Sequence, residues 1–89
     1  MVAEYAQGLI DNLSKKDRNV VESLVLKMTD NEELTKRVCV YMAGQVGQEE
    51  IDHFIKLDFD MQIEACTNYL IIALTSGDMK RKELNIFLN

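Results

Sequence analysis

The chain has 89 residues, of which 47% are hydrophobic and 28% charged, with no proline and a formal net charge of −5. A chain of this length is expected to form one domain, residues 1–89. No run reaches the ~18 apolar residues of a membrane span, and the first residues carry two acids and no base. We therefore expect a cytoplasmic protein with neither a membrane segment nor a secretory leader.

Apolar residues recur at helical spacing along the whole chain, and no alternating strand pattern is found. This pattern predicts an all-α protein, a compact bundle of five or six short helices. The predicted helices cover about residues 2–13, 15–28, 31–46, 48–57, 61–75 and 79–88.

Capping residues mark the predicted ends of these helices. A side-chain oxygen just before a helix accepts a hydrogen bond from one of the free amides of the first turn. The predicted caps are Ser14 (with Asp17 three residues on), Asp30, Asp60 and Asp78. Gly47 and Gly77 are predicted to end the third and fifth helices, because glycine adopts the left-handed conformation at little cost.

Two helices are predicted to be apolar on all sides. The run VCVYMA in the third helix and the run LIIAL in the fifth leave no face suited to water. We expect these two helices at the centre of the bundle. We also expect a homodimer, with a monomer as the alternative, because four amphipathic helices cover two such helices poorly. Cys39 and Cys66 are interpreted as buried, reduced thiols, with a disulfide or redox pair as the alternative.

The third and fourth predicted helices resemble a helix-turn-helix in spacing. Ala43 and Gly47 stand where such a motif has a small residue and a turn glycine. The first turn of the second helix would then hold Glu49, Glu50 and Asp52. DNA affinity comes largely from cations that neutralise phosphates, so the sign of the charge is wrong. The pattern favours an ordinary pair of packed helices.

The middle third of the chain is strongly acidic. Residues 30–60 contain three bases and eight acids, which accounts for the whole net charge of −5. We interpret this region as a docking surface for a basic partner protein. A merely solubilising surface and mimicry of nucleic acid are the alternatives. The predicted partner-binding residues are Glu49, Glu50, Asp52, Phe54, Asp58, Phe59 and Asp60, with the two phenylalanines as exposed anchors.

Two basic clusters stand at the starts of predicted helices, where cations oppose the helix dipole. Salt bridges to residues 49–60, within the chain or across a dimer, would compensate for this, as would a bound anion such as phosphate. Side chains that extend into solvent are the further alternative. The clusters consist of Lys15, Lys16 and Arg18, and of Lys80, Arg81 and Lys82.

The sequence contains no arrangement typical of an enzyme. His53 is the only histidine, neither cysteine has a base at recognisable spacing, and these three residues do not make a zinc site. We expect no catalysis, no metal and no cofactor.

The leading prediction is a small acidic regulator, inhibitor or adaptor that acts by protein–protein binding. Its size and composition suit a phage- or plasmid-encoded protein. The alternative is a DNA-binding transcriptional regulator with an atypical helix-turn-helix, whose phosphate contacts come from the two basic clusters.

Overall fold

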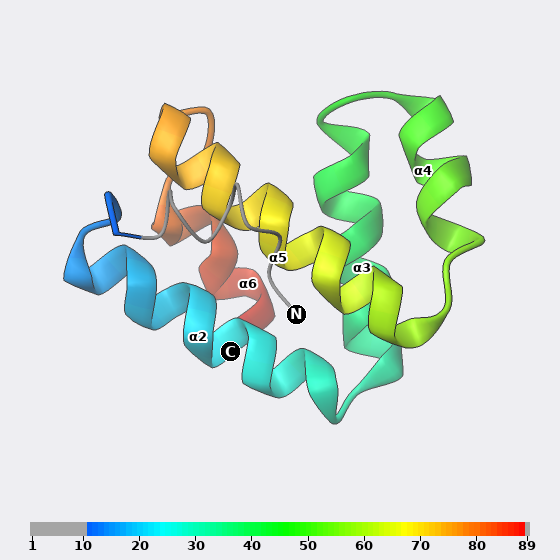
Figure 1. Cartoon of the computed structure of the whole chain (residues 1–89), viewed down its shortest axis with the longest axis horizontal. Helices are drawn as coiled ribbons and strands as arrows, with labels where there is room; N and C mark the ends of the chain where they lie inside the picture. Colours follow the sequence, from blue (N-terminus) through cyan, green and yellow to red (C-terminus); the bar gives the residue numbers. More distant parts are fainter. Residues whose placement is uncertain (1–10, 89) are drawn as a thin grey trace.

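The computed structural model of the chain describes residues 11–88, which form an all-α bundle as predicted (Figure 1). The elements are α2 (Lys15–Thr29), α3 (Glu32–Gly44), α4 (Gln48–Ile55), α5 (Phe59–Ser76), the 3₁₀ helix η1 (Arg81–Leu84) and α6 (Asn85–Leu88). The predicted helix at 2–13 lies largely outside the described residues, and residues 11–13 form a turn and a bend. Within residues 11–88, none of the helices combines the length and apolarity needed to cross a membrane.

The core lies between α3 and α5. These helices bury six side chains each, against three in α2 and one in α4. In Figure 1, α5 runs across the middle of the bundle between α2 and α3. Their all-apolar runs are nevertheless not fully covered, since Val40 of α3 and Ile72 of α5 are exposed. The predicted central position of the two helices agrees with this packing.

The start of α2 follows its sequence signal, and the start of α3 does not. The Ser14 hydroxyl accepts a hydrogen bond from the Asp17 amide at 3.1 Å, as predicted. At α3 the predicted cap, Asp30, is wrong. Asn31 takes that role and accepts from the Leu34 amide at 3.0 Å. Asp30 is instead the C-cap of α2, because its amide donates to the carbonyls of Lys27 and Met28.

The start of α5 also differs from its prediction. Asp58 caps this helix by accepting a hydrogen bond from the Met61 amide at 2.9 Å, so the helix begins at Phe59. Asp60, the predicted cap, lies inside the first turn. There its charge still suits the positive end of the helix dipole. Gly77 ends α5 in the left-handed conformation, as predicted, with φ 84°.

Gly47 has a different role from the predicted one. Helix α3 already ends at Gly44, and Gly47 is the residue just before α4. Its φ of 155° and ψ of 173° lie in a region that is essentially restricted to glycine. Gly47 therefore sets the turn between the two helices and does not act as a left-handed stop.

The predicted helix at 79–88 is broken into two short pieces. A 3₁₀ turn, η1, precedes the single turn of α6. The residue before η1 is Lys80, whose amide donates to the Glu83 carboxylate at 2.7 Å, so the predicted cap at Asp78 is wrong. The Asp78 carboxylate instead accepts a hydrogen bond from the Ser76 hydroxyl at 3.0 Å.

Cys39 and Cys66 link α3 to α5 inside the core. Both are buried, as predicted, and they are paired as a disulfide with Cα atoms 5.8 Å apart, a normal separation for such a bond. The favoured interpretation of two reduced thiols is therefore wrong, and the alternative of a disulfide holds.

Candidate protein-docking groove

A groove of about 560 Å³ runs between α4 and α5. Three carboxylates line it: Glu49 and Glu50 from the first turn of α4, and Glu64 from α5. Among the described residues that line the groove there is no lysine or arginine. We call this feature the α4–α5 groove.

The floor of the α4–α5 groove is apolar. Phe54 is only 2% exposed and packs edge-on against Tyr69, with ring centroids 5.3 Å apart. Met61, at the rim, is 48% exposed, and Leu57 is half-buried. An apolar floor beneath carboxylates suits a ligand that carries cations on aliphatic stems, such as lysine and arginine side chains.

Tyr69 joins the floor of the groove to its acidic rim. Its hydroxyl donates a hydrogen bond to a carboxylate oxygen of Glu50 at 3.2 Å. Burial raises the pKa of the Tyr69 phenol, and the nearby charge of Glu50 and this hydrogen bond raise it further. The phenol therefore stays neutral and holds the Glu50 side chain against α5.

Gln62 fixes α4 against α5 and so shapes the groove. This side chain is buried, and its amide nitrogen donates to the Phe54 carbonyl at 3.2 Å. That carbonyl belongs to the last turn of α4 and also accepts the Leu57 amide at 3.1 Å, so the Gln62 side chain adds a link from α5 to an acceptor already used by the backbone. The hydrogen bond therefore holds the end of α4 in place.

The predicted partner-binding residues divide into two groups. Glu49, Glu50 and Phe54 line the α4–α5 groove. The predicted role of Phe54 as an exposed anchor is wrong, because α5 covers its ring. Four others lie beside the groove without lining it: Asp52, Asp58, Phe59 and Asp60.

These four residues have local contacts or positions of their own. Asp52 accepts a hydrogen bond from the Gln48 side chain at 3.2 Å, and Asp58 caps α5. Phe59 is half-buried at the start of α5, and the exposed Asp60 follows it. They extend the negative charge around this end of the molecule.

Sequence reasoning missed the contribution of α5 to the groove. Met61, Glu64, Ala65, Asn68 and Tyr69 follow one another at helical spacing, so they lie on one face of the helix. Two members of this stripe, Glu64 and Asn68, are polar. These two residues were the available signal.

The two basic clusters meet at the start of α2. Arg81 of η1 forms an ion pair with Asp17 of α2, with Nη1 and Oδ1 3.0 Å apart. This contact joins segments 64 residues apart in sequence. It places the cluster of Lys80, Arg81 and Lys82 beside the N-terminal turn of α2, which carries the other cluster. We call this region the basic end.

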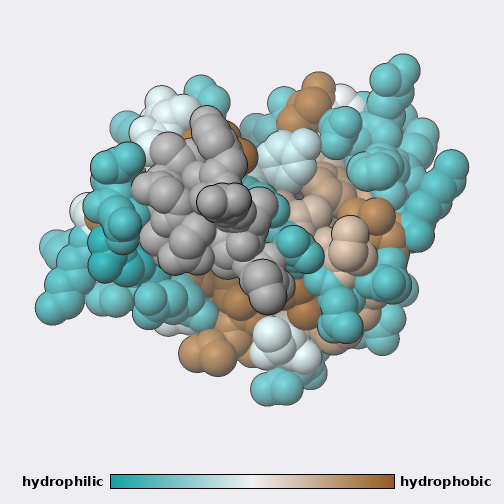
Figure 2. Space-filling model, viewed as in Figure 1, coloured by the Kyte–Doolittle hydropathy of each residue, from teal (hydrophilic) through white to brown (hydrophobic). Residues whose placement is uncertain are grey.

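The basic end and the acidic helix lie far apart. In Figure 1, α4 stands at the right and the start of α2 at the left of the longest axis, and Figure 2 shows hydrophilic residues over both ends. Within residues 11–88 the one ion pair is Arg81–Asp17. The predicted salt bridges to residues 49–60 are not formed between the residues that the structure describes.

The described residues include no group of three or more His, Cys, Asp or Glu side chains that could hold a metal ion. Comparisons with known proteins add nothing to this picture: no family model, no curated protein and no solved structure matches the chain.

Proposed function

We propose that the protein is a small non-catalytic regulator or adaptor that binds a basic segment of another protein in the α4–α5 groove. The observation that carries this proposal is the set of Glu49, Glu50 and Glu64 above an apolar floor, with no lysine or arginine among the described lining residues. Lysine or arginine side chains of the partner would pair with these carboxylates and lay their stems on Met61 and Leu57. Binding at this place would recruit the partner or block its own surface.

A basic amphipathic peptide, made of lysine and leucine at helical spacing, tests the proposal. Titrated into the ¹⁵N-labelled chain, it should shift the amide signals of His53, Met61 and Glu64. The double variant Glu49→Lys, Glu64→Lys should weaken binding about tenfold, the effect of two partly exposed ion pairs of about 0.7 kcal/mol each.

The matched control is Glu22→Lys, Glu32→Lys. It makes the same change of charge at exposed positions of α2 and α3. It should weaken binding no more than about twofold, the residual effect of screened long-range charge. Equal losses in the two double variants, or signal shifts away from α4 and α5, would remove the groove from the proposal.

The proposal retains a homodimer and a phage or plasmid origin, as expected from size and composition. The expected cytoplasmic setting is at odds with the Cys39–Cys66 disulfide, because such bonds are rare in that compartment. The exposed side chains of Val46 and Ile72, which line one hollow between α3 and α5, support a contact between copies. Sedimentation at tens of micromolar should show a dimer that Ile72→Ser converts to monomer. A monomeric wild-type chain would contradict the proposed dimer but would leave the proposed binding in the α4–α5 groove untouched.

A second candidate function is nucleic-acid binding through the basic end. The convergence of the two clusters around Asp17 favours it, because phosphate binding depends on grouped cations. Helix α4 is a poor recognition helix, since its first turn carries Glu49 and Glu50. Random duplex DNA at low salt is the test. Binding that is lost in Lys15→Glu, Lys82→Glu and falls steeply with salt would support this function, and no binding would exclude it.

A further inference from the structure

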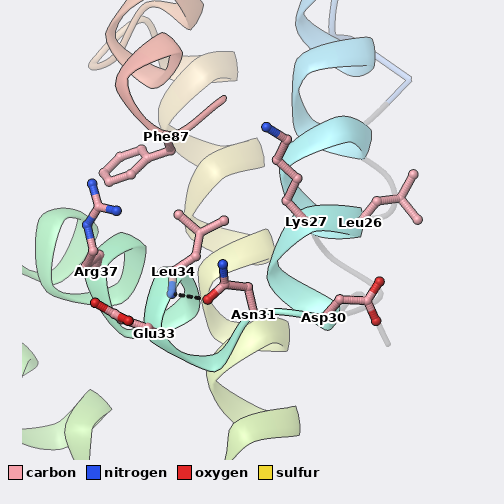
Figure 3. A pocket seen from close by; sticks show the side chains of 8 residues that line it. All are labelled: Leu26, Lys27, Asp30, Asn31, Glu33, Leu34, Arg37 and Phe87. Carbon is pink, nitrogen blue, oxygen red and sulfur yellow. Dashed lines mark hydrogen bonds between the residues drawn. The ribbon is translucent and has the colours of Figure 1, made fainter. Parts of the chain in front are cut away.

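A second hollow lies on another part of the molecule, where the end of α2, the start of α3 and α6 meet. Figure 3 shows Leu34 and Phe87 in its interior, with Lys27 on one side and Arg37 on the other. Its volume is about 680 Å³. The acidic residues of this hollow, Asp30 and Glu33, belong to the α2–α3 connection and the first turn of α3.

The hollow continues along α3 and α6. A neighbouring hollow of about 480 Å³ shares Arg37 and Phe87 with the first and is lined further by Lys36, Val40, Tyr41 and Ile86. Its charged lining residues, among those described, are both cations. The two hollows form one strip, which we call the α3–α6 groove.

Several large apolar side chains of the α3–α6 groove are exposed to solvent. Leu26 is 69% exposed at one end, and Ile86 and Val40 are 62% and 44% exposed at the other. Exposed aliphatic side chains grouped around a hollow are typical of a protein-binding site. Leu26 and Val40 lie on two different helices and Ile86 on a third, so the strip is formed by the tertiary fold.

Lys27 and Arg37, two of the cations of the groove, contact α6. The Lys27 ammonium donates to the Leu88 carbonyl at 2.6 Å, and the Arg37 guanidinium lies over the Phe87 ring, 5.8 Å from its centroid. Tyr41 packs edge-on against the same ring at 5.4 Å. Asp30 and Glu33 balance the charge at the α2 end of the groove, whereas the half along α3 and α6 has a positive border, Lys36 and Arg37, beside its apolar strip.

These charges select the occupant. Along α3 and α6, where the charged lining residues are Lys36 and Arg37, a second copy seated symmetrically would bring these cations close to the same cations of the other copy, which disfavours self-association there. A helix with apolar residues at every third or fourth position and carboxylates beside them would satisfy both the strip and its border. We propose that the α3–α6 groove docks an acidic amphipathic helix of a partner protein. This site is independent of the α4–α5 groove, and together they would give an adaptor two surfaces of opposite charge preference.

The experiment uses two synthetic helical peptides of equal length and equal leucine content, one carrying glutamate and the other lysine. The acidic peptide, titrated into the full ¹⁵N-labelled chain, should shift the amide signals of Arg37, Val40 and Ile86. The basic peptide should leave these signals in place. Shifts of the same three signals by both peptides, or no binding of the acidic peptide at millimolar concentration, would overturn the proposal.

Variants separate this site from the rest of the surface. Val40→Ser and Lys36→Glu should each weaken the acidic peptide at least fivefold, whereas the matched controls Ile55→Ser and Lys56→Glu, at exposed positions of and just after α4, should change its affinity less than twofold. Equal losses in variants and controls would overturn the site. A wild-type dimer that Val40→Ser makes monomeric would also overturn it, because a second copy would then occupy the groove.

Discussion

The phenol of Tyr69 donates a hydrogen bond to the Glu50 carboxylate at 3.2 Å and so joins the middle of α5 to the first turn of α4. The contact lies at the edge of the α4–α5 groove. The position of the Glu50 carboxylate at the rim therefore depends on the Tyr69 phenol keeping its proton.

The raised pKa of Tyr69 makes part of the stability pH-dependent at high pH. Above about pH 10 an unfolded tyrosine loses its proton, while Tyr69 in the folded chain keeps it. The contribution of Tyr69 to stability is therefore complete below about pH 10 and is lost as the pH rises through the folded pKa of this phenol. Absorbance of tyrosinate at 295 nm should show one late-titrating phenol that disappears in Tyr69→Phe. Glu50→Gln should make this phenol titrate earlier, and Asp52→Asn should not.

Replacing Gln62 should loosen α4. Gln62→Met keeps the length of the side chain but removes the hydrogen bond to the Phe54 carbonyl, at a cost of about 1 kcal/mol. Urea unfolding measures this loss, and hydrogen exchange should show faster opening of the amides of α4 than of α2. The exposed Gln45→Met is the control and should leave both measurements unchanged. Uniform acceleration of exchange in every helix would contradict a local role.

Two glycine replacements should have opposite effects. Gly77→Ala should destabilise the chain by about 1 kcal/mol, because its φ of 84° is unfavourable for a residue with a Cβ atom. Gly44→Ala should instead stabilise it by about 0.5 kcal/mol, since Gly44 is helical and a Cβ there would meet nothing closer than the Ile51 side chain at 4.0 Å. Thermal unfolding of both variants measures the difference. A stabilising Gly77→Ala would contradict the left-handed end of α5.

The pairing of Cys39 with Cys66 can be tested by alkylation. Under denaturing conditions without reductant the chain should take up no label, and after reduction it should take up two. Reduction should lower the free energy of unfolding by about 3.5 kcal/mol, the value for a crosslink across 27 positions. The double variant Cys39→Ala, Cys66→Ala should not respond to reductant. Two labels before reduction would show free thiols and agree with a reducing compartment.

The fold class and the order of the helices could be predicted because apolar spacing is a local signal. The cap at Ser14 was found for the same reason. Where two suitable residues stand close together, as with Asp30 and Asn31, only the packed structure decides which one caps the helix. The sequence offers no means of choosing, because both side chains can accept the same kind of hydrogen bond.

The site could be predicted only in part. The charge of residues 30–60 indicated an acidic surface, but the contribution of Glu64 and Tyr69 depends on the packing of α5 against α4. The burial of Phe54 has the same cause. The meeting of Arg81 with Asp17 joins residues 64 positions apart, and nothing in either local segment indicates it.

The distance between α4 and the basic end has a consequence for how partners approach. Opposite charges at the two ends of a molecule 32 Å long give it an electric dipole moment along that axis. The field of a charged macromolecule exerts a torque on such a dipole and turns the protein before the two touch. The field of a cationic partner would thus turn α4 toward it, and added salt would slow the encounter by shortening the reach of the field.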